Sequence, residues 1–192
     1  MTTVSIVGTG NMGSAIASVV EKGGNTVQLL GQTDADQPVS GDIVVLAVPY
    51  PAVSQVIAER GEQLAGKVVV DITNPLDFET FDSLTVPADS SAAAEIAAAL
   101  PSSKVLKAFN TNFAATLASG TIGEQPTTVL IAGDDAEAKA QLAEVVTAGG
   151  LRAIDAGALH RARELEGLGF LQISLAAREK LAWTGGFAVQ LG

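Results

Sequence analysis

The pattern Gly8-Thr9-Gly10-Asn11-Met12-Gly13 lies between two segments of different periodicity, and this placement constrains the fold of the whole chain. Residues 4–7 read Val-Ser-Ile-Val and predict a short strand. Apolar residues between positions 12 and 20 recur at helical spacing, and Gly23-Gly24-Asn25 closes that helix. A strand that passes through a glycine loop into a helix is the opening unit of a doubly wound α/β fold.

The same alternation of short β-branched runs and longer helical periods continues along the chain. It indicates an α/β fold of the Rossmann type: a doubly wound, mainly parallel sheet with helices on both faces and a C-terminal helical extension. We expect a single domain over residues 1–192, with the last helix and tail, about residues 158–192, packed on the core. Further strands are predicted at 26–30, 43–48, 68–72, 105–108, 128–132 and 151–154, and helices at 51–63, 91–100, 134–149 and 159–181. Ser91 and Asp134 are expected to cap the second and third of these helices.

The three glycines of the loop have separate physical roles. Gly8 permits the tight turn, Gly10 lets the main chain approach a pyrophosphate, and Gly13 lets the helix pack closely on the sheet. The start of the helix presents free N–H groups and a positive dipole end to the same anion. We therefore predict that the loop binds a dinucleotide, through Gly8, Thr9, Gly10, Asn11, Met12 and Gly13.

The segment after the second predicted strand bears on which dinucleotide is bound. NAD-specific folds place an acidic residue there to bind the ribose hydroxyls. This chain has Gly31-Gln32-Thr33, which includes no Arg or Lys, and its first carboxylate follows at Asp34. The neutral, hydroxyl-bearing stretch favours NADP(H), with Thr9, Gln32 and Thr33 as donors to the 2′-phosphate. NAD is the alternative, if Asp34 folds back onto the ribose.

Three other strand ends fall on the carboxyl edge of the predicted sheet, where ligands bind in such folds. Ala47-Val48-Pro49 ends the third strand, and its main chain is expected to line the ribose and pyrophosphate. Asn74-Pro75 and Asn110 end the fourth and fifth strands. Their polar groups either bond the nicotinamide carboxamide or a second substrate, or cap their own loops.

Charge and composition narrow the class of partner. Eleven basic residues against 21 acidic ones give a formal net charge of −10, which opposes binding to nucleic acid or to an anionic membrane. The chain has no cysteine, so it has no disulfide and no thiolate metal site. No signal peptide or membrane-spanning run is evident, and we expect a cytoplasmic protein.

Several stretches together resemble one family, the coenzyme F420-dependent NADP oxidoreductases. They follow the family order and cover nearly the whole chain. The matching stretches are the glycine loop, Leu46-Ala47-Val48-Pro49-Tyr50, Asp71-Ile72-Thr73-Asn74-Pro75-Leu76, Lys107-Ala108-Phe109-Asn110-Thr111, Asp155-Ala156-Gly157 and Ala162-Arg163-Glu164-Leu165-Glu166. One departure stands out: the family commonly has Gly-Ser-Arg for the 2′-phosphate where this chain has Gly31-Gln32-Thr33.

The resemblance implies NADP(H) at the glycine loop, with the nicotinamide near Asn74, Pro75 and Asn110. A deazaflavin, coenzyme F420, would stack against it in a pocket closed partly by the last helix, and hydride would pass reversibly between nicotinamide C4 and deazaflavin C5. Such a transfer needs no side-chain acid or base, so no catalytic residue and no metal ligand are assigned.

Other functions remain open at this stage. One is NADPH-dependent reduction of FMN, FAD or a ferric complex, and another is a dinucleotide-binding module without turnover. A third, an imine or β-hydroxyacid reductase, usually carries a larger helical domain than this chain can accommodate.

The last predicted helix holds two further hints. Gly167 and Gly169 lower helix stability, so they suggest the close approach of another backbone or of a flat ligand. A long apolar helix beyond a complete sheet also needs a partner surface, which makes a homodimer through this helix one arrangement to test. The other expected partner is a small-molecule redox acceptor.

Overall fold

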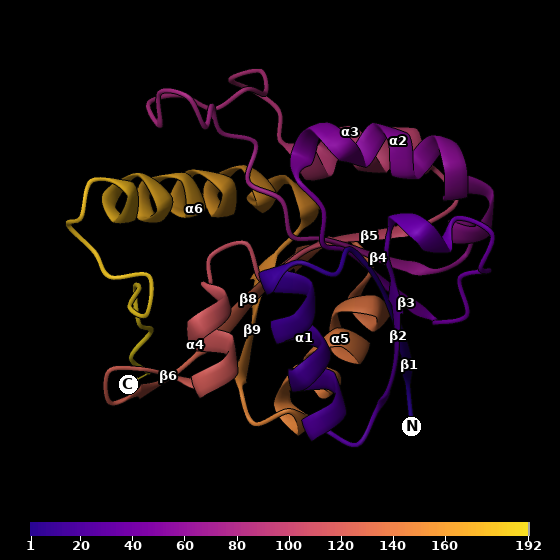
Figure 1. Cartoon of the computed structure of the whole chain (residues 1–192), viewed down its shortest axis with the longest axis horizontal. Helices are drawn as coiled ribbons and strands as arrows, with labels where there is room; N and C mark the ends of the chain where they lie inside the picture. Colours follow the sequence, from indigo (N-terminus) through magenta and orange to yellow (C-terminus); the bar gives the residue numbers. More distant parts are fainter. Residues whose placement is uncertain (192) are drawn as a thin grey trace.

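The computed structural model describes residues 1–191, and its centre is one sheet of seven strands (Figure 1). The strands of this sheet are β1 (Thr3–Val7), β2 (Thr26–Leu30), β3 (Ile43–Leu46), β4 (Val68–Asp71), β5 (Lys104–Lys107), β8 (Thr128–Gly133) and β9 (Arg152–Gly157). Their order in space is β2-β1-β3-β4-β5-β8-β9. The expected doubly wound α/β fold is therefore confirmed.

The sheet is parallel except at one junction. Strands β2, β1, β3, β4 and β5 run parallel to one another, and β8 runs parallel to β9. The pair β5 and β8 is antiparallel, with Leu106 opposite Gly133. The sheet is thus mainly parallel, as predicted, although the sequence did not indicate that the last two strands are reversed.

Helices cover both faces of the sheet (Figure 1). One face carries α1, α4 and α5, and the other carries α2, α3 and α6. Short 3-10 turns connect some elements. The helices are α1 (Asn11–Lys22), α2 (Tyr50–Arg60), α3 (Ala92–Ala99), α4 (Ala114–Ser119), α5 (Ala136–Ala148) and α6 (Ala162–Ala177), and the turns are η1 (Gln32–Asp34), η2 (Gly61–Leu64) and η3 (Leu159–Arg161).

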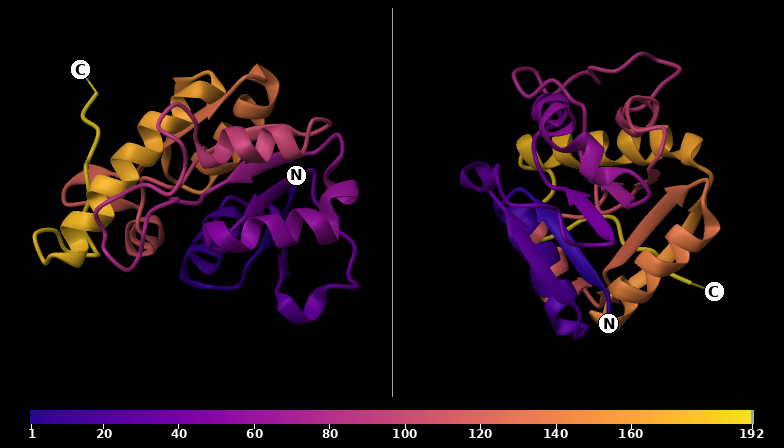
Figure 2. Two further views of the ribbon diagram at one scale, coloured as in Figure 1. Left: turned by 90° about the horizontal axis from the view of Figure 1, so that it is seen from above. Right: turned by 90° about the vertical axis from the view of Figure 1, so that its right-hand side faces the viewer.

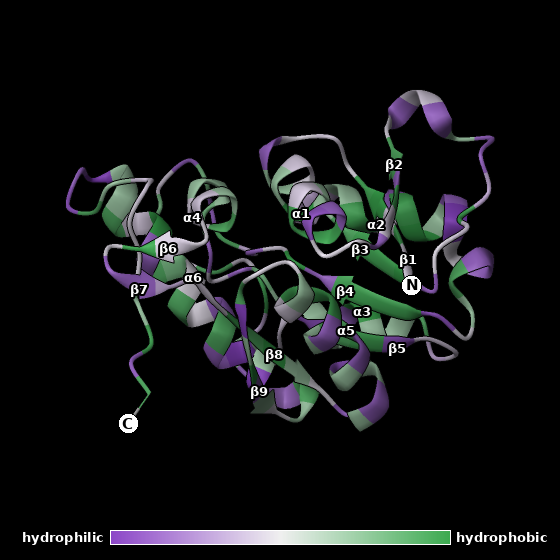
Figure 3. Cartoon of the chain, turned by 90° about the horizontal axis from the view of Figure 1, so that it is seen from below, coloured by the Kyte–Doolittle hydropathy of each residue, from purple (hydrophilic) through white to green (hydrophobic). Residues whose placement is uncertain are grey.

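The central strands are apolar on both sides because each face packs on helices. Strand β3 reads Ile-Val-Val-Leu and β4 reads Val-Val-Val-Asp, and all eight side chains are buried. One apolar core lies under α1, α4 and α5, and a second lies under α2 and α3. In Figure 3 these strands appear green, with the hydrophilic colours concentrated in loops and on outer helix faces.

Side-chain caps fix the starts of two helices. The Ser91 hydroxyl accepts a hydrogen bond from the Ala94 N–H at 3.1 Å, as predicted. For α5 the cap is Asp135, whose carboxylate accepts from the Ala138 N–H at 2.8 Å. The expected start at Asp134 was one residue early, because the Asp134 carboxylate accepts from the Leu159 N–H instead.

The last helix is shorter than its apolar periodicity predicted. It begins with the turn η3 and ends at Ala177, although the pattern extends to Leu181. Glu179 has a left-handed backbone, φ 57, which ends the helix without a glycine or proline. The tail up to Leu191 then runs away from the N-terminus (Figure 2), and Gly192 lies outside the described residues.

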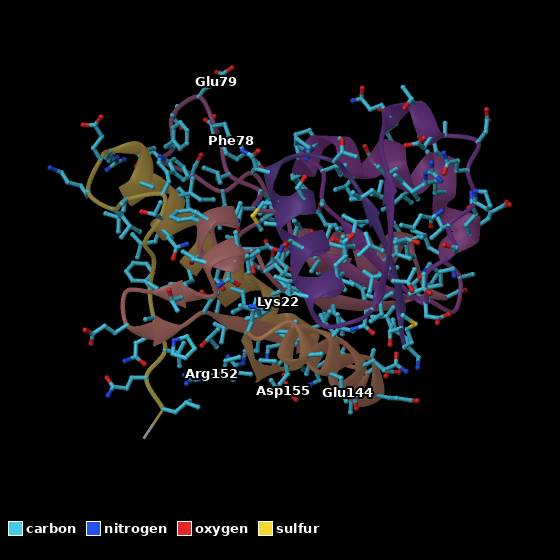
Figure 4. The ribbon with its side chains drawn as sticks, turned by 60° about the horizontal axis from the view of Figure 1, so that its bottom comes forward. Lys22, Phe78, Glu79, Glu144, Arg152 and Asp155 are labelled. Carbon is cyan, nitrogen blue, oxygen red and sulfur yellow. The ribbon has the colours of Figure 1, made fainter. Side chains whose placement is uncertain are left out.

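Two peripheral segments complete the chain. Strands β6 (Thr121–Ile122) and β7 (Gln125–Pro126) form a small antiparallel hairpin that the sequence analysis missed. The excursion between β4 and α3 lies on the surface, and Phe78 and Glu79 mark its tip in Figure 4. Among residues 1–191, no helix has the length and apolar character needed to cross a membrane.

Candidate functional site

The candidate site lies where the sheet changes its direction of growth. The chain leaves β1 toward β2 on one side, and it leaves β3 toward β4 on the other. This switch point opens a crevice at the carboxyl ends of β1 and β3. A cavity of about 830 Å³ occupies the crevice. Its lining residues come from the glycine loop, the end of β2, the end of β3 and one side of α2.

Two glycines of the loop are required by close packing. Gly8 has φ 120, and a Cβ there would lie 2.1 Å from the Ala47 carbonyl oxygen. A Cβ on Gly13 would lie 2.0 Å from the Gly8 carbonyl oxygen. Any side chain at either position would therefore push the loop, α1 and the β3 end apart.

Gly10 is different, because its missing side chain leaves open space. Apart from Gly10 itself and its two chain neighbours, no atom of the described residues lies within 4 Å of the position where its Cβ would be. Gly10 is also the N-cap of α1, and no side chain within residues 1–191 caps that helix end. The N–H groups of the first turn are thus left for an anion that approaches over Gly10. The pyrophosphate of a dinucleotide fits this arrangement.

The structure places nine of the fifteen predicted site residues on the cavity wall: Gly8, Thr9, Gly10, Gly31, Gln32, Thr33, Ala47, Val48 and Pro49. Asn11, Met12 and Gly13 form the first turn of α1 directly behind the loop. The predicted strand at 43–48 ends two residues earlier, at Leu46, so that Ala47 and Val48 leave the sheet and line the cavity.

Asp34 lines the cavity, and its carboxylate is already bonded. One oxygen accepts from the Gly31 N–H at 2.8 Å, and the other accepts from the Gln37 side-chain amide at 2.8 Å. The carboxylate therefore closes the turn that follows β2.

Arg60 also lines the cavity, and the sequence analysis did not identify it. The residue ends α2, and its side chain is 4% exposed. Its guanidinium donates to the Gln37 carbonyl at 2.7 Å and to the Asp34 carbonyl at 2.5 Å. The position is 29 residues beyond Gly31, so only the fold brings it beside that segment.

Asn74 and Asn110 meet at the neighbouring strand ends and bond each other. The Asn74 amide donates to the Asn110 carbonyl at 2.9 Å, and the Asn110 amide donates to the Asn74 side-chain oxygen at 2.9 Å. The Asn110 amide also donates to the Leu165 carbonyl of α6 at 2.8 Å. The pair therefore joins the carboxyl edge to the last helix, whereas direct contact of Asn74, Pro75 or Asn110 with a nicotinamide stays a prediction.

A buried ionic cluster lies beneath this edge, and the sequence analysis assigned it no role. Lys107 Nζ is 2.7 Å from an Asp71 carboxylate oxygen, 2.8 Å from a Glu166 carboxylate oxygen and 2.6 Å from the Thr73 carbonyl. The two carboxylates and the lysine are essentially unexposed. Asp71 and Lys107 are register partners on β4 and β5, and Glu166 comes from α6. The cluster therefore fixes the last helix to the sheet.

The Glu166 carboxylate also receives hydrogen bonds from α3. It accepts from the N–H groups of Ala92 and Ala93, at 3.0 and 3.3 Å. Burial raises the pKa of Glu166, and the Lys107 charge opposes that rise. Nearby, burial together with the Glu95 carboxylate, which accepts from the Tyr50 hydroxyl, raises the pKa of Tyr50. Lys107 is thus the main group that opposes the effect of burial on the pKa of Glu166.

Gly169 is where α6 approaches the asparagine pair, and it gives a first prediction. A Cβ at Gly169 would lie 2.3 Å from the Asn74 side-chain oxygen and 2.9 Å from the Asn110 carbonyl. We expect Gly169→Ala to lower the free energy of unfolding by about 1–3 kcal/mol through overpacking, as measured by urea denaturation.

Gly167 supplies the matched control for that prediction. It lies in the same helix, and no described atom outside that helix lies within 4 Å of the position where its Cβ would be. Gly167→Ala should therefore stabilise the protein by up to about 1 kcal/mol. Equal stabilities of the two variants would contradict the close contact at Gly169.

The chain is similar to proteins of one reductase family. A family model described as NADP oxidoreductase, coenzyme F420-dependent, matches residues 28–75. The F420-dependent NADP reductase of Methanocaldococcus jannaschii is 31% identical over 171 residues, which cover 87% of this chain and 76% of that protein.

Two further proteins extend the comparison. A crystal structure from Arthrobacter sp. FB24, of a protein proposed to be an F420-dependent NADP reductase, has a TM-score of 0.85 and 26% identity, with full coverage of both chains. The metalloreductase STEAP3 of Rattus norvegicus is 32% identical over 136 residues, which cover 71% of this chain but only 27% of that protein.

Proposed function

The chain belongs to the F420-dependent NADP reductase family, and from this premise we propose that it transfers hydride reversibly between NADP(H) and a coenzyme F420-type deazaflavin. The observation that carries the proposal is the cavity at the β1/β3 switch point. Its walls are the glycine loop, the turn after β2 and the end of β3. This is where folds of this kind hold a dinucleotide.

In this proposal each site residue has a role that suits its place in the fold. The amides of Asn11, Met12 and Gly13 bind the pyrophosphate over Gly10, and Gly8 keeps the loop tight against Ala47. Thr9, Gly31, Gln32 and Thr33 face the adenosine ribose, whereas Ala47, Val48 and Pro49 line its other side. The nicotinamide end of the site is bordered by Asn74, Pro75 and Asn110, and α6 excludes water there.

The cofactors supply the chemistry: hydride would leave the nicotinamide C4 and join the deazaflavin C5, and a proton from water would join the ring nitrogen conjugated with C5, so that no side-chain acid or base is needed. What the protein contributes is alignment of the two rings, which can lower the barrier by several kcal/mol, up to about 7–11 kcal/mol in well-oriented systems. This division of work is consistent with a site made of main-chain groups, glycines and amides.

The assembly belongs to the same proposal. We propose that residues 1–192 form a single dinucleotide-binding domain, that the protein works in the cytoplasm and that α6 pairs two copies of it. Leu171 on α6 is half exposed, which supports a contact through this helix.

The test is anaerobic mixing of the purified protein with coenzyme F420 and NADPH, followed by the loss of the visible absorbance of the coenzyme. We expect rapid bleaching with NADPH. Parallel reactions with NADH and with FMN define the selectivity for each partner, and a reaction without protein is the control. Absence of bleaching by a protein that still binds NADPH would contradict the proposed acceptor.

A second candidate is NADPH-dependent reduction of a flavin or a ferric complex. The similarity to a metalloreductase over 71% of the chain favours it as the next alternative. Reduction of FMN or of a ferric chelate, with no reaction of the deazaflavin, would move the protein to this function. Tight nucleotide binding with no acceptor reduced would instead indicate a binding module.

A further inference from the structure

The part of the cavity wall that is formed by the segment after β2 carries no basic side chain. The segment Gly31-Gln32-Thr33 is neutral, and Asp34 adds a negative charge. A 2′-phosphate placed against this wall would need a positive charge to offset its own. Among the residues that line the cavity, Arg60 alone carries one.

The burial of Arg60 is unusual for its charge. Arginine is rarely buried without a carboxylate partner, because an uncompensated buried charge is costly. Arg60 takes part in none of the ion pairs within residues 1–191, although the chain has 21 acidic residues. Two carbonyl oxygens satisfy two of its five N–H donors. The structure thus holds a buried cation at a cavity wall, and among the described residues this cation forms no ion pair with a carboxylate.

The carbonyl bonds also fix the guanidinium beside the segment that is proposed to face the 2′-phosphate. The carbonyls of Asp34 and Gln37 belong to the turn that follows Gly31-Gln32-Thr33, and Thr9 lies against Gly31 from the glycine loop. The Asp34 carboxylate is turned to the Gly31 N–H and the Gln37 amide, and it makes no ion pair with Arg60. Glu59 also lines the cavity but is exposed, so solvent screens its charge.

We propose that Arg60, supplied by α2 and not by the segment after β2, is the counter-charge that selects the 2′-phosphate of NADP(H) in this protein. The guanidinium holds the turn that shapes the phosphate subsite and offsets the charge of the phosphate across the cavity wall. The inference rests on the proposed nucleotide site but not on the identity of the hydride acceptor.

The experiment uses two ligands that differ only in the 2′-phosphate, adenosine 2′,5′-bisphosphate and 5′-AMP. Their affinities for the full-length protein are measured by calorimetry at low salt, for the wild type and for Arg60→Met. A charge-assisted interaction with a phosphate corresponds to an effect on the affinity of about 10-fold or more. We therefore expect the wild type to prefer the bisphosphate by about 10-fold or more, and Arg60→Met to remove that preference.

Two further variants serve as controls, one for the loss of a positive charge elsewhere and one for poor folding of Arg60→Met. Arg152→Met removes the same charge from the first residue of β9, which is labelled in Figure 4. The Arg152 guanidinium also donates to a carbonyl, that of Val189. This control should keep the preference of the wild type. Arg60→Lys keeps the charge but loses the planar fork, so it should retain part of the preference even where Arg60→Met folds poorly.

Two results would overturn the proposal. If Arg60→Met lowers the affinity for both ligands by the same factor, Arg60 only holds the turn. A wild type with no preference for the bisphosphate would show that the subsite does not recognise the phosphate. Neither ligand contains a nicotinamide, so both outcomes are independent of whether the protein reduces a deazaflavin.

Discussion

Replacement of Lys107 by methionine should lower the free energy of unfolding by about 3–5 kcal/mol, because it leaves two carboxylates buried without their cation. Asp71 and Glu166 both lie within 2.8 Å of the Lys107 ammonium, and none of the three groups has appreciable access to water. Urea denaturation followed by circular dichroism measures the change.

Lys104→Met is the matched control for Lys107→Met. Lys104 lies on the same strand and pairs with Asp135 at 3.2 Å, but that pair is partly exposed. Its loss should cost at most about 1 kcal/mol. Equal losses of stability in the two variants would contradict a structural role for the buried cluster.

The Lys107→Met variant should also respond to pH in a defined direction. Burial raises the pKa of Glu166, and without Lys107 nothing comparable opposes that rise. The folded variant then binds more protons than the unfolded chain, so its stability increases as the pH falls from neutral toward the ordinary carboxyl range. A stability deficit relative to the wild type that is independent of pH over that range would contradict this explanation.

Replacement of Gly10 by alanine should abolish most nucleotide binding while leaving the fold intact. The new methyl group would enter open space, and the backbone of Gly10, φ −73 and ψ −173, suits any residue. In the proposed site, that space is where the pyrophosphate would meet the first turn of α1. Loss of two charge-assisted hydrogen bonds would weaken NADPH binding by about 100-fold or more.

Gly13→Ala provides the contrasting case. Its methyl group would lie 2.0 Å from the Gly8 carbonyl oxygen, so this variant should lose both stability and binding. Thermal unfolding and NADPH fluorescence titration on both variants separate the two effects. A Gly10→Ala protein that binds NADPH as tightly as the wild type would contradict the position assigned to the pyrophosphate.

Local patterns were sufficient to predict most of the fold. Strand β2 was predicted at its observed bounds, and the capping serine of α3 was identified, since both depend on neighbouring residues. The reversal of β8 against β5 was missed, because a buried strand has the same apolar pattern in either direction. The end of α6 was misplaced, because Glu179 adopts a left-handed backbone without a glycine to signal it.

The candidate site also has parts that local sequence patterns predict and parts that they do not. The glycine loop and the end of β3 are each a single short stretch of sequence. The glycine motif and the predicted strands and helices around it were therefore enough to locate much of the cavity wall. Arg60 and Glu166 reach their partners only through packing between elements distant in the chain. Lys107 did leave a signal, since a lysine among apolar strand residues requires a buried anion, but its partners Asp71 and Glu166 are 36 and 59 residues away.

The most direct test of the account is transfer of isotope from the nucleotide to the deazaflavin. NADPH deuterated at nicotinamide C4 is mixed anaerobically with coenzyme F420 and the protein, separately for each of the two C4 positions, and the reduced coenzyme is analysed by mass spectrometry. We predict that one of the two labelled forms delivers its deuterium to the deazaflavin. Reduced coenzyme that carries no deuterium from either form, or no reduction at all, would contradict direct hydride transfer at this site.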